Sequence, residues 1–322
     1  MKDPGYLTVD VTFSGDAVIA AYPSAVTAFD AVTGSTRWTA MTPFKPIWMT
    51  ATDDTVYVTG GYTGAVAAYD SATGTQRWTV ALPAEYFAGS VASETGGKVA
   101  VLSAFNEFVI LDPATGQLIS RVPHFTGGSA GVAFDVSNGE LFIGSAGESG
   151  GQVGLYDLAT GAARWMLDVP SNTLSNPVFT ESAVVFSADG GDVYSVDRVS
   201  GTVLWQAGLS VPGERVALGG DGIIAAAAAG GDIEVFDIAS GAQVVRVSAN
   251  ASGSNYGQLG VGGGVVTVKA YDASVEFYDA TTGDYIDASE PYASVHMIVA
   301  RGSLIIVSGE AAEPTLDVFS IG

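Results

Sequence analysis

A five-residue motif that recurs about every forty residues constrains the fold of this chain more than any other feature. It reads Asp-x-x-(Thr or Ser)-Gly and follows an alternating apolar run each time. The motif occurs at Asp30–Gly34, Asp70–Gly74, Asp112–Gly116, Asp157–Gly161, Asp197–Gly201, Asp237–Gly241 and Asp279–Gly283. Successive aspartates are 40, 42, 45, 40, 40 and 42 residues apart, so the 322-residue chain is predicted to be an array of one repeated unit.

An incomplete eighth unit follows the seventh. Leu316–Ser320 matches the strand that precedes the motif in the first unit, Val26–Asp30, but the sequence ends at Gly322. With Leu7–Phe13 as the first strand of unit one, the eighth unit supplies only three strands. We therefore expect either a three-stranded last unit or a short outer strand lent to it by residues 1–6, because an unpaired strand edge invites aggregation.

Each unit contains four short segments typical of strands. Those of the second unit are rich in Val, Thr, Ala and aromatic residues, and they are Ile47–Ala51, Thr55–Thr59, Ala65–Tyr69 and Gln76–Ala81. Ala225–Ala229 is also assigned to a strand, because it occupies the second-strand position of unit six. Four antiparallel strands per repeat predict an all-β, eight-bladed β-propeller with an incomplete last blade. It would form a single domain over residues 1–322, with a seven-bladed ring as the alternative.

The motif aspartates are interpreted as structural turn residues. An Asp side chain at the end of a strand accepts hydrogen bonds from the next backbone N–H groups, and Gly supplies the left-handed conformation that closes the hairpin. A catalytic carboxylate would not recur in every unit. The predicted structural residues are Asp30, Asp70, Asp112, Asp157, Asp197, Asp237 and Asp279.

Tryptophan follows the motif glycine by four residues in four units, at Trp38, Trp78, Trp165 and Trp205. A flat side chain repeated at one place in each blade can wedge between neighbouring sheets and bury about 150–250 Å². In units three, six and seven the position is held by Ser120, Val245 and Asp287. We expect those blades to pack less firmly, or in another way.

The repeat resembles the PQQ-like (quinoprotein-type, BamB-like) β-propeller family, including its tryptophan-docking position, and Val66–Trp78 is a good example. The resemblance covers nearly the whole chain. It implies one of two uses: a quinoprotein alcohol dehydrogenase, with the quinone and a calcium ion at the ring axis and commonly an adjacent disulfide, or a scaffold, as in outer-membrane assembly lipoproteins and the extracytoplasmic propellers of bacterial signalling proteins. This chain has no Cys and lacks the length of the dehydrogenases, which favours the scaffold.

Charge and hydropathy exclude several partners. The formal charge is −22, and the twelve basic residues are scattered, whereas binding to nucleic acid or anionic membrane needs clustered Lys and Arg. Apolar runs such as Ile223–Ala229 are far shorter than the ~20 residues of a membrane span. Met1–Gly5 contains no signal-like apolar stretch, so the chain is either cytoplasmic or has had a signal removed. We favour the second and expect an extracytoplasmic or secreted monomer whose signal or anchor is absent from this chain.

No catalytic motif is found. Phosphate-binding loops, nucleophile elbows and paired carboxylates are absent from the sequence. The two histidines, His124 and His296, are too few for a His-rich metal site, and the lack of Cys excludes thiolate zinc sites. The acidic loops contain no EF-hand spacing. We therefore predict no catalytic residues and no cofactor, with PQQ and calcium as the alternative.

The loops between blades and those between the second and third strands should share one face, opposite the Asp motifs, and function is expected there. Exposed aromatic residues can anchor a protein partner or stack on sugar rings. The predicted ligand- or partner-binding residues are Trp48, Tyr86, Phe87, His124, Phe125, Asn176, Tyr256 and Tyr292. A simpler interpretation is that Trp48 and Tyr86 only plug the central channel.

The sequence thus predicts a non-catalytic scaffold for a protein or carbohydrate. One alternative is a small PQQ- and calcium-dependent quinoprotein dehydrogenase, which the family resemblance and the acidic loops favour. The other is the sensor domain of a larger signalling protein.

Overall fold

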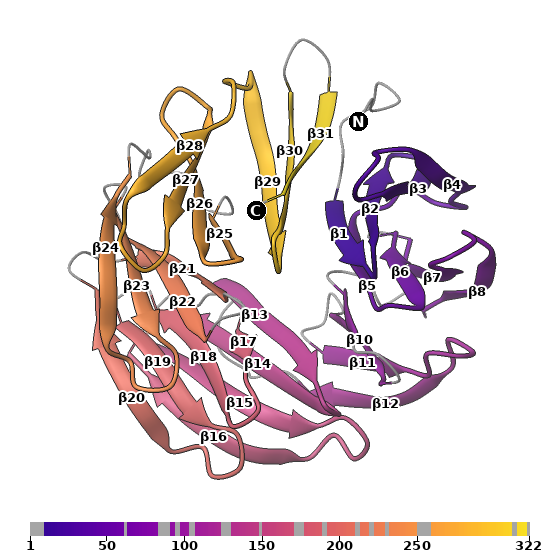
Figure 1. Ribbon diagram of the computed structural model, residues 1–322. Coiled ribbons are helices and arrows are strands. Elements are labelled where there is room, and N and C mark those ends of the chain that lie inside the picture. The colour runs from indigo at the N-terminus through magenta and orange to yellow at the C-terminus, as the bar shows by residue number, and fades with distance from the viewer. Residues whose placement is uncertain are drawn as a thin grey trace.

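The computed structural model describes residues 10–60, 63–82, 91–93, 97–102, 107–123, 130–147, 150–170, 177–188, 192–209, 213–218, 222–228, 232–249, 259–310 and 314–320. These residues form 31 strands in eight antiparallel sheets, arranged as blades around a central axis (Figure 1). Within these ranges no residue is helical, so no described helix could cross a membrane. The predicted all-β, eight-bladed propeller is confirmed, and the seven-bladed alternative is wrong.

The strands of each blade follow chain order. Blades 1 and 2 contain β1 (Asp10–Ser14), β2 (Ala17–Tyr22), β3 (Ala25–Asp30), β4 (Thr36–Met41), β5 (Trp48–Ala51), β6 (Thr55–Thr59), β7 (Ala65–Asp70) and β8 (Gln76–Ala81). Blades 3 and 4 contain β9 (Val91–Ser93), β10 (Val99–Leu102), β11 (Glu107–Leu111), β12 (Leu118–Pro123), β13 (Ala130–Ser137), β14 (Glu140–Gly147), β15 (Gly150–Asp157) and β16 (Ala163–Val169).

The second half continues the same pattern. Blades 5 and 6 contain β17 (Val178–Phe179), β18 (Ala183–Ala188), β19 (Asp192–Asp197), β20 (Val203–Gly208), β21 (Gly213–Leu218), β22 (Ile223–Ala228), β23 (Asp232–Asp237) and β24 (Gln243–Ser248). Blades 7 and 8 contain β25 (Leu259–Gly262), β26 (Val265–Lys269), β27 (Val275–Asp279), β28 (Tyr285–Ala288), β29 (Ser294–Arg301), β30 (Leu304–Glu310) and β31 (Pro314–Ser320).

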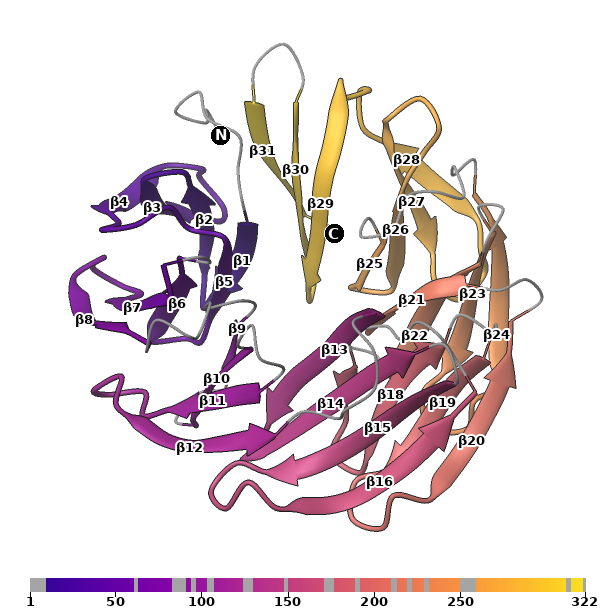
Figure 2. The ribbon, with the colours of Figure 1, turned by 180° about the vertical axis from the view of Figure 1, so that it is seen from behind.

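The observed strands of blade 2 differ from the predicted ones by one residue at two ends. The alanine run of unit six is β22, as its position in the repeat indicated, and Leu316–Ser320 lies in β31. Blade 8 has three strands among the described residues, and both face views show it between blades 7 and 1 (Figures 1 and 2). The other expectation, an outer strand from residues 1–6, falls outside the described residues.

The core lies between the blades, because each sheet is covered on both faces by its neighbours. Blade 1 packs Ile19 and Trp38 against Val58 and Tyr69 of blade 2. Its opposite face packs against blade 8, where Phe29 belongs to the same buried cluster as Ile306 and Leu316. Blade 8 therefore closes the ring by apolar packing against blade 1.

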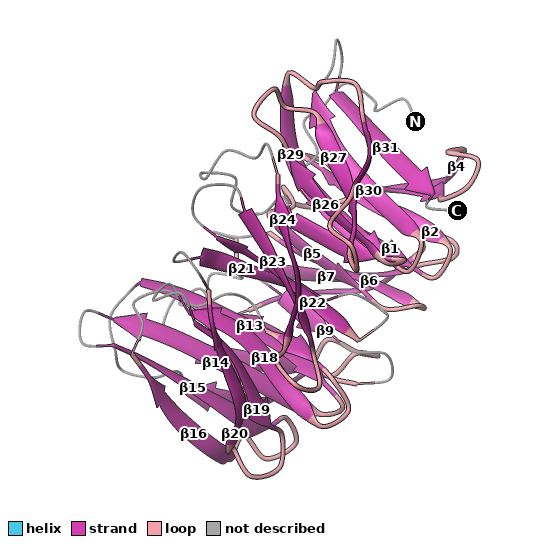
Figure 3. Cartoon of the chain, turned by 60° about the vertical axis from the view of Figure 1, so that its left-hand side comes forward, coloured by secondary structure: helices cyan, strands magenta, loops and turns pink. Residues whose placement is uncertain are grey.

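Two backbone hydrogen bonds of blade 1 show which turns and loops lie together on each face of the ring. At one end of the strands, Ala31 N–H donates to the Asp16 carbonyl (3.2 Å), which joins the two turns of blade 1. At the other end, Thr42 N–H donates to the Ser24 carbonyl (2.9 Å), which joins the start of an inter-blade loop to a second-to-third-strand loop. We call these the turn face and the loop face. The hairpin turns of the turn face gather at one end of the strands in Figure 3.

Candidate functional site

The motif aspartates bind within their own turns. The Asp30 carboxylate accepts the N–H of Val32 (3.1 Å), and both the N–H (2.7 Å) and the hydroxyl (2.9 Å) of Thr33. Asp70, Asp112, Asp157, Asp197, Asp237 and Asp279 each accept at least two bonds in the same way. These hydrogen bonds, with those from arginine in blades 1, 2 and 4, hold the pKa of all seven carboxyls below its usual range.

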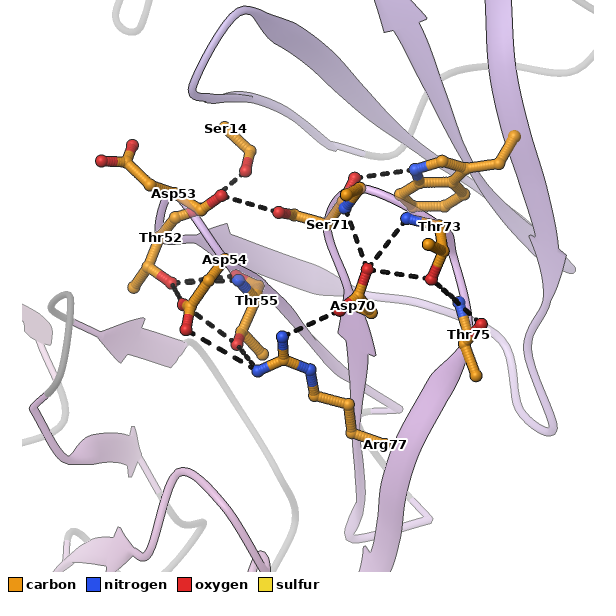
Figure 4. A network of polar contacts seen from close by, with 12 residues as sticks. Ser14, Thr52, Asp53, Asp54, Thr55, Asp70, Ser71, Thr73, Thr75 and Arg77 are labelled. Atoms are coloured by element: carbon orange, nitrogen blue, oxygen red, sulfur yellow. Dashed lines mark hydrogen bonds and ion pairs between the residues drawn. The ribbon is translucent and has the colours of Figure 1, made fainter.

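An arginine three residues after the motif glycine extends this network in blades 1, 2 and 4. In blade 2, Arg77 lies between Asp70 (2.9 Å) and Asp54 (3.7 Å) and donates to the Thr55 hydroxyl (2.7 Å), as Figure 4 shows. Arg37 and Arg164 occupy the equivalent positions. Sequence reasoning missed these arginines, although their fixed distance from the glycine was a readable signal. Since the side chains are partly exposed, each ion pair contributes little stability.

The repeated tryptophans join each blade to the next. Trp38 of blade 1 donates its indole N–H to the Ser71 carbonyl of blade 2 (2.7 Å). Its ring lies over Gly74, where a Cβ atom would come within 2.5 Å of the indole and where φ is +70°, so only glycine fits. Trp78, Trp165 and Trp205 donate equivalent bonds to Pro113, Arg198 and Ile238. The turn face is therefore occupied by contacts that hold the ring together.

A buried ion pair joins blades 4 and 5. The Arg198 guanidinium donates to the Glu140 carboxylate at 2.7 and 2.9 Å, and both side chains are 7% exposed. Arg198 also donates to the carbonyl oxygens of Thr180 and Ser137 and lies 5.1 Å from the Phe179 ring centre. Sequence reasoning missed this pair. Its full set of hydrogen-bond partners identifies it as a structural contact.

On the loop face, the start of β5 carries an exposed aromatic side chain, and a carboxylate of blade 1 binds the backbone of the next residue. Trp48, the first residue of β5, is 47% exposed. The next residue, Met49, donates its N–H to Asp10 at the start of β1 (2.7 Å), and Asp10 also accepts the N–H of Val11 (2.9 Å). Burial raises the pKa of Asp10 to about 6, although these two hydrogen bonds act against the rise. We call this pair of residues the Trp48–Asp10 site.

The site has a simple chemistry. An indole on a paired strand offers a rigid apolar surface, and a carboxylate with a pKa near 6 can accept hydrogen bonds in one form and donate one in the other. Such an arrangement can bind a partner, and it contains no nucleophile beside a base. Among the described residues, no group of three or more His, Cys, Asp or Glu side chains is placed to hold a metal ion.

The other predicted binding residues divide into two groups. Tyr292 is only 7% exposed, and its hydroxyl donates to Asp317 (2.8 Å), so it packs between blades 7 and 8 and leaves little surface for a partner. The remaining six lie outside the described residues: Tyr86, Phe87, His124, Phe125, Asn176 and Tyr256. His296 is in β29. Asp10 was not predicted, because its partner Met49 lies 39 residues away.

Sequence comparison assigns the family. The family model described as "Outer membrane protein assembly factor BamB" matches residues 22–109, 63–123, 104–209 and 189–312. The chain belongs to this BamB family. The predicted PQQ-like, BamB-like repeat is thereby confirmed. No curated protein matches the chain in sequence.

Three solved structures share the fold. BamB from Moraxella catarrhalis has a TM-score of 0.73 at 16% identity, with 97% of this chain and 96% of that chain covered. The computationally designed Ika8 protein has a TM-score of 0.79 at 20% identity, covering 99% and 98%. Saccharomyces cerevisiae Sqt1 has a TM-score of 0.75 at 11% identity, covering 100% and 98%. These identities support a common fold and nothing more.

Proposed function

We propose that this protein is a non-catalytic, extracytoplasmic scaffold that binds a protein partner on its loop face. The observation that carries the proposal is the exposed indole of Trp48 on a strand held from both sides. The Trp48 backbone pairs with Thr59 in β6, and Asp10 holds the adjacent N–H of Met49. A rigid, partly exposed Trp loses little conformational entropy on binding and is enriched among residues that dominate interface energies.

The family description supports a protein rather than a carbohydrate as the partner. It names an assembly factor, and assembly requires contact with other proteins. The same description refers to the outer membrane, which supports an extracytoplasmic location. A carbohydrate stacked on Trp48 is the competing outcome of the experiment below.

Site-specific photocrosslinking tests the proposal in the cells that make the protein. A photoreactive amino acid at position 48 should yield a discrete crosslinked protein, whereas the same residue at position 166 should not. Met166 is the control because it is equally exposed, at 49%, but lies on the outer strand β16. Trp48→Ala should then weaken binding of the isolated partner by about 2 kcal/mol or more, and Met166→Ala should leave it unchanged. Crosslinks from position 166 alone, or binding of glycans in place of protein at position 48, would contradict the proposal.

The quinoprotein alternative predicts a ligand response. In the described part of the chain, no three Asp or Glu side chains are grouped to hold a calcium ion. A ligand at a hundred times its dissociation constant adds about 2.7 kcal/mol to stability. An increase in Tm on adding PQQ with calcium, together with oxidation of an alcohol, would favour the dehydrogenase over the scaffold.

A further inference from the structure

The fourth strands of blades 1 to 7 share a one-residue bulge. Their pairing with the third strand shifts by one residue three positions after the motif glycine, as at Arg37 in blade 1 and Leu204 in blade 5. A bulge changes the direction in which the extra side chain points. The bulge residues, in chain order, are Arg37, Arg77, Ile119, Arg164, Leu204, Val244 and Ile286.

In blades 1, 2 and 4 the bulge residue is an arginine that binds the motif aspartate. One carboxylate oxygen of Asp30 accepts the hydrogen bonds of its own turn, and the other accepts the Arg37 guanidinium (2.7 Å). Arg77 and Arg164 donate to the equivalent oxygen in their own blades, at 2.9 and 3.3 Å. The motif carboxylate can therefore bind a guanidinium with the oxygen that the turn does not use.

Blades 5, 6 and 7 keep the carboxylate but have an aliphatic bulge residue. Leu204, Val244 and Ile286 are 52%, 39% and 51% exposed. In these three turns the backbone and hydroxyl donors all bind one oxygen of the motif aspartate. Within the described ranges no group donates to the other oxygen, which is Oδ2 of Asp197, Asp237 and Asp279.

These three blades are consecutive, so their bulges form one stretch of the outer rim. The outer strands β20, β24 and β28 follow one another around the ring in both face views (Figures 1 and 2). Exposed side chains of Val199, Val203 and Tyr285 extend the apolar surface. We define the aliphatic rim as the three bulge residues and the three motif aspartates of these blades: Leu204, Val244, Ile286, Asp197, Asp237 and Asp279.

Blade 3 is set apart from this stretch, although its bulge residue is Ile119. Blades 2 and 4, which flank it, both carry a bulge arginine. A cation also acts on its motif aspartate, because Lys98, after the Thr115 hydrogen bonds, contributes to the lowered pKa of Asp112. The combination of aliphatic bulges and carboxylates without a cation is therefore continuous only over blades 5 to 7 among the described residues.

We propose that the aliphatic rim binds a basic segment of another protein. Its Arg or Lys side chains would lay their methylene groups over the exposed aliphatic residues. Their charge would reach the carboxylate oxygen that an arginine of the same chain binds in blades 1, 2 and 4. Neighbouring exposed apolar side chains bordered by charged groups are typical of interaction surfaces.

Charge complementarity favours a different, basic protein over a second copy of this chain. Each copy carries a formal charge of −22, and pairing two rims would bring their motif aspartates together. Arg198 and Arg246 of blades 5 and 6 are paired with Glu140 and Asp232 and do not supply the missing cations. The rim is separate from the Trp48–Asp10 site on the loop face, so the two proposals can fail independently.

A labelled peptide with three arginines, Gly-Arg-Leu-Gly-Arg-Leu-Gly-Arg-Leu-Gly, is the probe, and fluorescence anisotropy at low salt measures its binding to the full chain. Asparagine at all three rim aspartates should weaken binding about tenfold, because it keeps the acceptor oxygen of the turn and removes the charge. This set is Asp197→Asn, Asp237→Asn and Asp279→Asn. The matched control, Asp30→Asn, Asp70→Asn and Asp157→Asn, removes three charges that arginine already binds and should change binding less than about threefold. Trp48→Ala should have no effect.

Arginine at the bulges gives a second, independent set of variants. Leu204→Arg, Val244→Arg and Ile286→Arg copy the residue of blades 1, 2 and 4, so each should bind its own motif aspartate and together they should abolish binding of the probe. The control adds the same charge at exposed apolar positions of blades 1 and 4, with Val32→Arg, Met41→Arg and Met166→Arg, and should weaken binding less than about threefold. Circular dichroism and Tm check that every variant is folded.

Three results would overturn the proposal. They are no binding at millimolar peptide, equal weakening by the two asparagine sets, and equal weakening by the two arginine sets. Equal weakening would mean that the probe responds to the net charge of the protein and not to the rim. Concentration-dependent dimerisation in sedimentation experiments, abolished by the three bulge arginines, would show instead that a second copy is the occupant.

Discussion

The interface between blades 4 and 5 and the interface between blades 7 and 8 use the same positions of the repeat in opposite ways. At the first, Trp165 lies over Gly201 and donates to the Arg198 carbonyl (3.0 Å), beside the buried Glu140–Arg198 pair. At the second, Asp287 replaces the tryptophan, and a pocket of about 460 Å³ remains. One interface is filled by the protein, and the other leaves room for something else.

This difference shows that one propeller can contain both tightly packed interfaces between blades and interfaces that include a pocket. Each blade is held by two neighbours, so blade 8 keeps its apolar packing against blade 1 through Phe29, Ile306 and Leu316, and its own cluster with blade 7, even though a pocket opens in part of the contact with blade 7. A departure from the repeat does not always open a pocket, because Val245, at the equivalent position of blade 6, packs against the apolar cluster between blades 6 and 7. The pocket at Asp287 is therefore a property of the interface between blades 7 and 8.

Trp165→Ala should have the largest effect, because it would turn the filled interface into a hollow one. Removing a buried Trp side chain costs roughly 3–5 kcal/mol of unfolding free energy. Ser120→Ala is the matched control, since Ser120 holds the same position in blade 3, and it should not lower stability because the buried Ser120 hydroxyl has no hydrogen-bond partner among the described residues. Urea denaturation gives both values. Equal, small losses for the two variants would show that the tryptophan wedge does not stabilise the ring.

Glu140→Gln should have the next largest effect, about 2–3 kcal/mol, because it leaves the Arg198 guanidinium buried without a counter-charge. Glu140 also pairs with Arg164, which is more exposed, so Arg164→Gln alone should cost less than about 1 kcal/mol. Replacing both Glu140 and Arg198 with Met should recover most of the loss in urea denaturation. A double variant as unstable as Glu140→Gln would mean that the pair itself, rather than the unpaired charge, determines stability.

The propeller could be predicted from the sequence because the hydrogen bonds of each turn form between residues that are close together in the chain. Asp30, Thr33 and Gly34 interact within five residues, and the same spacing repeats along the chain. The tryptophan positions could also be read, since Trp38 and the turn it docks on are fixed by the repeat. Ser120, Val245 and Asp287 were the three exceptions at that position, and at Asp287 the structure has a pocket.

The candidate site could be predicted only in part. Trp48 was proposed from the sequence because large aromatic residues near inter-blade loops are conspicuous, and it is the first residue of β5. Asp10 and the Glu140–Arg198 pair depend on contacts across 39 and 58 residues that no local pattern encodes. Whether a loop tyrosine is exposed, as expected of Tyr292, likewise depends on how neighbouring blades pack, and its hydroxyl is instead bonded to Asp317.

Asp10→Asn tests whether the interface between blades 1 and 2 is sensitive to pH, and its effect differs from the first two because it should change with pH. Folding raises the pKa of Asp10 from 3.8 to about 6, so the folded protein binds the proton more tightly than the unfolded chain does. The stability from this group is complete below about pH 4 and is lost as the pH rises to about 6.

The asparagine of this variant would still accept the Met49 N–H but cannot ionise. The variant should therefore gain stability relative to the natural protein between about pH 4 and pH 6, and the gain should stay constant above that range. The motif aspartates have lowered pKa values, so their contribution to stability is lost as the pH falls. Both proteins contain these aspartates, so this contribution cancels in the stability difference between them. Urea denaturation of both proteins at each pH gives the difference directly. A stability difference that does not change with pH would show that the pKa of Asp10 is the same in the folded protein as in the unfolded chain. The Trp48–Asp10 site would then contain no carboxyl group with a raised pKa.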